Sequence, residues 1–219
     1  MRSNDGTSGL TFLEAARRRQ IVDCAIESLA EEGYAQTTLA RIAQRAAVSK
    51  SVIVYHFGTK DDVLRAVADE VFARATEVVR PQVSAETSPS GQLTAYLRAR
   101  VGFLATHRAH MLALFEIWMN LRDERGQLRF GEADAVDTVD AIERILRAGQ
   151  DSGEFGAFDT AVTAMAVRQA VDGVLLQLRA RPDLDLDRYA EELTALFGRA
   201  TAAPGRRTRS RGTTRKGSR

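Results

Sequence analysis

Apolar residues recur at intervals of three and four positions along most of this 219-residue chain, which places them on one face of an α-helix. No stretch alternates apolar and polar residues as a half-buried strand does. The pattern predicts helices at about 12–32, 38–45 and 49–56, a fourth that opens at Lys60, and others at about 92–106, 109–122, 129–151, 159–180 and 186–199. The segment 81–91 has the composition of a linker. The sequence therefore predicts an all-α fold of about nine helices.

Composition excludes several other classes of protein. Hydrophobic residues make up 44% of the chain and charged residues 27%, as is usual for a globular protein. Cys24 is the single cysteine, so no intramolecular disulfide can form. The N-terminus lacks the apolar run of a signal peptide, and the most apolar stretch, 161–178, is interrupted by charged residues. We therefore expect a cytoplasmic protein that does not interact with a membrane.

Charge is distributed unevenly along the chain. Residues 1–60 carry a net charge of +2, residues 61–203 carry −7 and residues 204–219 carry +7. A polyanion is attracted by the two ends and repelled by the middle, which favours an N-terminal nucleic-acid-binding module joined to an acidic body. The basic tail has two interpretations: a non-specific DNA arm, or a consequence of the general preference for arginine, with 28 Arg against 3 Lys. The acidity of the body disfavours an anionic effector.

Residues 38–57, TLARIAQRAAVSKSVIVYHF, have the spacing of a helix-turn-helix. In this motif the second helix enters the major groove of DNA with its N-terminal end first. Ser49 is expected to cap that helix, and its first turn then exposes Lys50, Ser51 and Val52. A small core would set the angle between the two helices, and it is predicted to comprise Leu39, Ile42, Val48, Ile53 and Phe57.

The stretch from Gly33 to Val63 resembles the DNA-binding domain of the TetR/AcrR family of transcriptional regulators. The matching residues are Gly33-Tyr34, Thr37-Thr38, Ile42-Ala43, Ala46, Val48-Ser49, Tyr55-His56-Phe57 and Thr59-Lys60. The chain departs from the family pattern at Ala47, where a glycine is usual. It departs again at Val52 and Val54, where polar or aromatic residues are more frequent, so the DNA sequence that relatives recognise cannot be transferred to it.

The resemblance implies a set of DNA contacts. It assigns phosphate contacts to Thr38, Tyr55, His56 and Lys60, and it places Lys50, Ser51 and Val52 nearest the bases. His56 has a second interpretation as a cation that stabilises the C-terminal end of its helix. Arg17, Arg18 and Arg19 either add phosphate contacts or form a solvated basic face.

The sequence and the resemblance together predict a four-part organisation. Residues 1–11 are a disordered N-terminus, 12–58 the helix-turn-helix domain, 59–203 a larger helical domain for effector binding and dimerisation, and 204–219 a disordered basic tail. The last two helices would form a homodimer, which predicts a near-palindromic double-stranded DNA operator.

A small apolar or mixed effector would occupy a chamber between the helices of the larger domain. An aromatic and thioether stripe is the candidate lining, with soft or polar partners from a later helix: Phe103, His107, Met111, Phe115, Trp118, Met119, Met165 and Gln169. A stripe of this kind at helical spacing has an alternative interpretation as ordinary core.

Two other functions compete with a ligand-responsive repressor. An enzyme is disfavoured because no nucleophile motif, phosphate-binding glycine loop or third metal ligand beside His107 and His110 is visible. We accordingly predict no catalytic residues, no metal and no cofactor. The second alternative is a helix-turn-helix architectural or protein-partner factor without an effector, which the sequence does not separate from the repressor.

Overall fold

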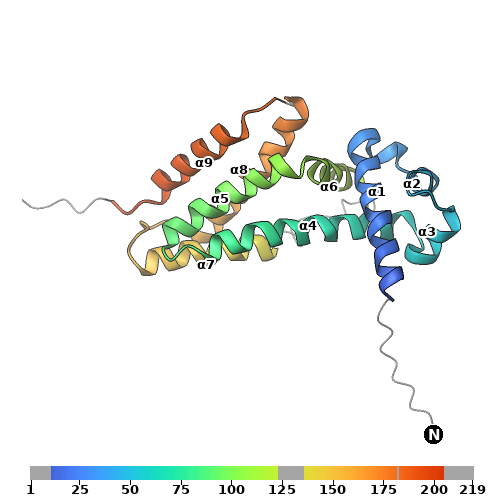
Figure 1. Ribbon diagram of the computed structural model, residues 1–219. Helices are drawn as coiled ribbons and strands as arrows, with labels where there is room; N and C mark the ends of the chain where they lie inside the picture. Colours follow the sequence, from blue (N-terminus) through green and yellow to red (C-terminus); the bar gives the residue numbers. More distant parts are fainter. Residues whose placement is uncertain (1–10, 123–135, 182, 205–219) are drawn as a thin grey trace, which may run out of the picture.

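The computed structural model describes residues 11–122, 136–181 and 183–204, which fold into nine α-helices (Figure 1). An isolated bridge joins Phe155 and Ala202, and no strand forms among these residues, so the predicted all-α class is confirmed. None of the described helices is long and apolar enough to cross a membrane. The helices are α1 (Phe12–Gln36), α2 (Leu39–Arg45), α3 (Lys50–Phe57), α4 (Lys60–Ser84), α5 (Pro89–Thr106), α6 (Arg108–Asn120), α7 (Val136–Asp151), α8 (Thr160–Ala180) and α9 (Leu186–Thr201). The predicted disordered termini lie almost wholly outside the described residues.

Helices α1, α2 and α3 form a small head at one end of the molecule (Figure 1). Its centre is a cluster of fully buried apolar side chains, Ile21, Ala25, Ile42 and Ile53. These residues come from all three helices, so burying them fixes the angle between α2 and α3. The predicted core of the helix-turn-helix is therefore formed, with Leu39 and Val48 half-buried at its edge.

The straight part of α1 ends at Gly33, as predicted. Gly33 adopts φ 79° and ψ 173°, a conformation that residues with a side chain rarely adopt, and a short turn to Gln36 follows. Thr37 is buried and its hydroxyl donates to the Gly33 carbonyl at 2.8 Å. Thr38 instead caps α2, because its hydroxyl accepts the Arg41 N–H at 3.1 Å.

The turn between α2 and α3 contains Ala47 at φ 52°, the one non-glycine residue with positive φ in the described chain. This is the position where glycine was expected from the family pattern. Ser49 precedes α3 in extended conformation, but its side chain makes no capping hydrogen bond; its hydroxyl lies 2.7 Å from the Ser51 hydroxyl instead. The predicted N-cap position at Ser49 is therefore confirmed, but the expected side-chain hydrogen bond is absent, because the Ser49 hydroxyl pairs with that of Ser51.

The remaining helices form the body, and α4 runs from the head into it (Figure 1). Helix α5 packs against α4 and α9, α7 packs against α8, and α6 lies against α1.

The predicted linker 81–91 is wrong over most of its length. Pro81 lies inside the last turn of α4, which continues to Ser84, and α5 already begins at Pro89 after its cap Ser88. A proline in a last turn removes only one helical hydrogen bond, and Val79 and Val83 on either side still pack on the core.

We predict that Ala47→Gly raises the free energy of unfolding by about 1 kcal/mol, because glycine adopts positive φ without the contact that alanine suffers there. Urea denaturation followed by circular dichroism measures the change. The matched control is Ala46→Gly, one residue earlier at φ −77° and buried, which should lower stability by about the same amount. Equal losses in both variants would contradict the assignment of strain to Ala47.

Candidate nucleic-acid interface and effector cavity

The outer face of α3 carries the side chains predicted to approach the bases. Lys50 and Ser51 are exposed, and the exposed fractions of Tyr55 and Val54 are 75% and 44%. Val52 and His56 are half-buried beside them. Thr38 is also exposed, at the start of α2. The structure thus brings six of the seven predicted DNA-contacting residues to the surface of α2 and α3.

Arg18 and Gln20 of α1 make contacts that hold the helix-turn-helix in place. The Arg18 guanidinium lies 4.1 Å from the centre of the Phe57 ring and donates a hydrogen bond to the His56 carbonyl at the end of α3. Gln20 Nε2 donates to the Ala46 carbonyl at 3.1 Å, before the turn. Arg18 is therefore a structural contact to α3, which neither interpretation of the arginine triplet foresaw.

The arginines of α2 are engaged by carboxylates of α1. Arg41 pairs with Glu32 at 2.8 Å, and Arg45 pairs with Glu27 at 3.1 Å, with Glu32 and with Glu31. Lys50, in contrast, makes no ion pair or hydrogen bond with any described residue. A phosphate approaching the motif therefore meets the full charge of Lys50 but only the compensated charge of α2.

Lys60 is drawn inward, unlike Lys50. Its ammonium donates to the Tyr34 carbonyl at 2.9 Å and lies 4.1 Å from the centre of the Tyr34 ring. Burial lowers the pKa of Lys60 from its usual value. The phosphate contact predicted for Lys60 stays a prediction, since the side chain already has partners inside the protein.

The same Tyr34 peptide is held from its other side by the body. Glu116 of α6 is 8% exposed, and its Oε2 accepts the Tyr34 N–H at 3.0 Å. Tyr34 follows Gly33, so its N–H and C=O lie at the point where α1 stops being straight. Glu116 from α6 and Lys60 from α4 thus form a joint between head and body, which we call the Tyr34 joint. Local sequence patterns do not predict this role of Glu116, because its partner lies 82 positions away.

The residues predicted to line an effector chamber are spread over the packing of α5, α6 and α8. Phe103 and Met111 are buried core residues, and the Phe103 ring stacks on His107 at 4.2 Å. Trp118 lies 6.4 Å from Phe72. The other four are half-buried or exposed: Phe115, Met119, Met165 and Gln169.

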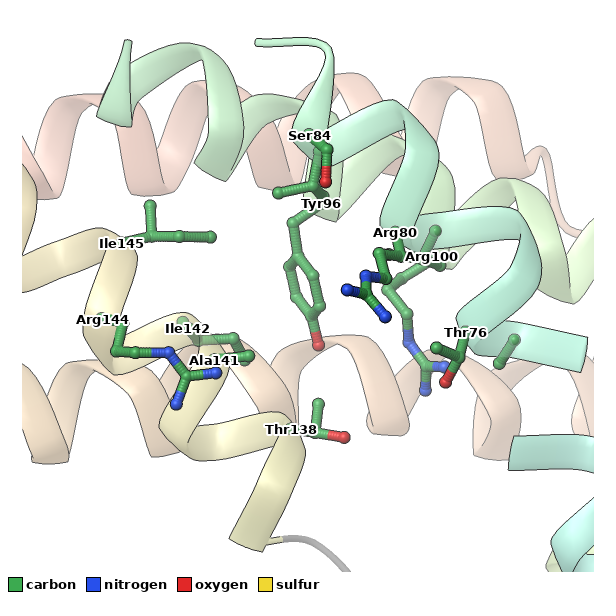
Figure 2. A pocket seen from close by; sticks show the side chains of 13 residues that line it. Thr76, Arg80, Ser84, Tyr96, Arg100, Thr138, Ala141, Ile142, Arg144 and Ile145 are labelled. Atoms are coloured by element: carbon green, nitrogen blue, oxygen red, sulfur yellow. The ribbon is translucent and has the colours of Figure 1, made fainter. Parts of the chain in front are cut away.

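A cavity of about 540 Å³ lies elsewhere, between α4, α5 and α7. Figure 2 shows Tyr96 of α5 between Arg80 and Arg100 on one side and Arg144 with Ile142 and Ile145 on the other. None of the eight predicted chamber residues lines it. One signal could have indicated it: Tyr96 and Arg100 are spaced i, i+4, which places a tyrosine and an arginine on the same face of α5.

The fold and the exposed α3 face define a helix-turn-helix protein with a helical second domain. Residues 21–67 match the family model described as bacterial regulatory proteins, tetR family. Residues 86–200 match the tetracyclin repressor-like C-terminal domain, which alone covers more than half of the chain. The chain therefore belongs to the TetR family of bacterial regulatory proteins, as its resemblance implied.

Individual relatives share a limited part of this sequence. The HTH-type transcriptional regulator BetI of Burkholderia cenocepacia is 36% identical over 84 residues, 38% of this chain and 43% of BetI. The chain thus spans about half the length of the curated relatives it matches. The fatty acid degradation regulator FadR of Bacillus halodurans superposes with a TM-score of 0.72 at 22% identity, over 83% of this chain and 94% of FadR. A Saccharomonospora viridis regulator solved in complex with choline superposes with a TM-score of 0.71 at 22% identity, over 87% and 100%. These structures share the fold.

We predict that Glu116→Leu lowers the free energy of unfolding by about 1–3 kcal/mol, because the Tyr34 N–H loses its acceptor. Hydrogen exchange at the Tyr34 amide should quicken in the same variant. The control is Glu77→Leu, an exposed glutamate of α4, which should change stability by less than about 0.5 kcal/mol. Unchanged exchange at Tyr34 would show that Glu116 does not secure the joint.

Proposed function

We propose that this protein is a sequence-specific DNA-binding transcriptional regulator that acts as a repressor. The observation that carries the proposal is the outer face of α3, where Lys50, Ser51 and Tyr55 are exposed together on a helix whose inner face is fully packed. A rigid helix with an exposed polar N-terminal turn is what reading the major groove requires. Lys50, Ser51 and Val52 would lie nearest the bases, and Thr38, Tyr55 and His56 would contact phosphates. Such a protein would work in the cytoplasm, where bacterial DNA is accessible.

The proposed regulator acts as a homodimer through α8 and α9. Both helices expose large apolar side chains: Val162 and Leu176 on α8 are 67% and 53% exposed, and Leu196 on α9 is 50% exposed. Exposed apolar groups on these two consecutive helices favour association with a second copy. Two recognition helices would then lie about 34–36 Å apart, one turn of DNA.

The proposed effector site is the cavity between α4, α5 and α7. A volume of about 540 Å³ suits a small molecule. Helix α4 lines this cavity with Ala75–Ser84 and contributes Lys60 to the Tyr34 joint, so a change in its tilt would reach the head. An effector that favours one tilt would shift the population between DNA-competent and DNA-incompetent states. Choline, found in the Saccharomonospora protein, carries a positive charge that three arginines would repel.

Selection of genomic DNA fragments by the purified protein, read by sequencing at near-physiological salt, tests this function. We expect one near-palindromic motif upstream of a few genes. A single half-site would contradict the dimer and leave the regulator standing. Uniform recovery of fragments would overturn sequence-specific reading and favour the architectural alternative.

We predict that Lys50→Gln and Lys60→Gln have different effects on binding to the selected operator. Loss of a phosphate contact flattens the plot of log affinity against log salt by about 0.9 per contact. Lys50→Gln should flatten the plot if it meets phosphate, or change the selected base if it reads one. Lys60→Gln should leave the slope unchanged and lower thermal stability, because it loosens the Tyr34 joint. A slope flattened by Lys60→Gln would instead confirm its phosphate contact.

A further inference from the structure

The cavity between α4, α5 and α7 differs in charge from the acidic body around it. Three arginines, Arg80, Arg100 and Arg144, are among its lining residues, and none of the described lining residues is acidic. Arg80 and Arg144 are exposed at the mouth, whereas the Arg100 side chain keeps only 16% of its surface. Figure 2 shows the Arg80 and Arg100 guanidinium groups on the same side of Tyr96. The described lining of the cavity therefore carries positive charge and no negative charge.

The charge of Arg100 is incompletely compensated inside the protein. Among the described residues its ion-pair partner is Asp172 of α8, which lies 4.0 Å from a guanidinium nitrogen, at the limit of an ion pair. Asp172 is shared with Arg168, whose Nε lies at 3.0 Å and whose side chain is 11% exposed. Two nearly buried cations thus depend on one carboxylate, which leaves an excess positive charge beside the cavity.

Hydrogen-bond acceptors for some nitrogens of these two arginines are also lacking among the described residues. Arg100 Nε is buried and donates to no acceptor among the described residues, and neither does one terminal nitrogen of Arg168. A buried donor without an acceptor is unfavourable, and a charged one is more so. An anion bound beside Arg100 in the cavity would supply the missing negative charge.

The rest of the lining suits an apolar body. Val79 and Val83 of α4 and Ile142 and Ile145 of α7 also line the cavity. Tyr96 lies between the two regions and is 6% exposed. Burial raises the pKa of the Tyr96 phenol, so its hydroxyl stays protonated at neutral pH and can donate to an anion.

We propose that this cavity binds an amphipathic organic acid, with the carboxylate held by Arg100 and Tyr96 and the apolar body packed between Val79, Ile142 and Ile145. Arg80 and Arg144 at the mouth attract the anion and contribute charge rather than shape. The inference rests on the proposed effector function of the same cavity and specifies the chemistry of the effector. It replaces the expectation, drawn from the net charge of the body, that anions are disfavoured.

Calorimetric titration of the full chain without DNA tests the site itself. The probes are octanoate, 4-phenylbutanoate and benzoate, each against its neutral primary amide, with octyltrimethylammonium as a cation of matched length. We expect at least one acid to bind about tenfold or more tightly than its amide, and the cation not to bind. Equal affinity of every acid and its amide, or no binding by any acid, would overturn the proposal.

Arg100→Met assigns the binding to this residue. Methionine keeps the apolar stem and leaves Asp172 paired with Arg168 alone, so the fold should be at least as stable as before. Affinity for the acid should fall about tenfold or more, while any affinity for the amide stays unchanged. The control is Arg98→Met, an exposed arginine two residues earlier on α5, which should bind the acid normally. Equal losses in both variants, or none in Arg100→Met, would contradict the assignment.

A second measurement separates this proposal from the proposed function. The acid that binds is added to the protein on its selected operator, and release of DNA is followed by fluorescence anisotropy. Binding that depends on Arg100 without release would support the anion site and contradict the effector role. Release by a neutral molecule, with no preference for acids, would support the regulator and overturn the anion site.

Discussion

The Tyr34 peptide, held by Glu116 from α6 and by Lys60 from α4, fixes the head to the body. It can be held in this way because Gly33 adopts a conformation that ends the straight part of α1 and leaves the next N–H and C=O without helical partners. A side chain at Gly33 would be strained at φ +79°. The orientation of the DNA-reading face therefore depends on a backbone group whose two partners both belong to the body.

Helix α4 connects this joint to the cavity. It is continuous from Lys60 to Ser84, a length of about 36 Å at the usual rise per residue. One end contributes the ammonium that contacts Tyr34, and the other end lines the cavity. A long helix tilts as a unit more easily than it bends, so a ligand that displaced Arg80 or Val83 would also move the partner of Tyr34. This is a physical path for coupling that needs no contact between the ligand and the head.

Local signals in the sequence predicted the head well. Gly33, the capping Thr38 and the turn at Ala47 each act on neighbouring residues, so their consequences can be inferred from the chain itself. Pro81 shows where a local rule misleads: proline and polar neighbours indicate a linker, yet packing of Val79 and Val83 carries α4 through it. The cavity was not predictable in this way, because its walls come from three helices and its floor is set by the long-range sharing of Asp172.

The aromatic stripe and the net charge of the body do not specify a ligand site, for a related reason. Phe103 and Met111 satisfy the pattern of a ligand chamber equally well as buried core, and periodicity does not distinguish the two. Net charge averages over the whole body, whereas fields in solution are screened within about 8–10 Å. Three arginines around one cavity therefore outweigh acidic groups on a distant surface, and those same acidic groups repel DNA from the body. An acidic exterior that directs DNA to the head is thus compatible with a basic cavity that selects an anion.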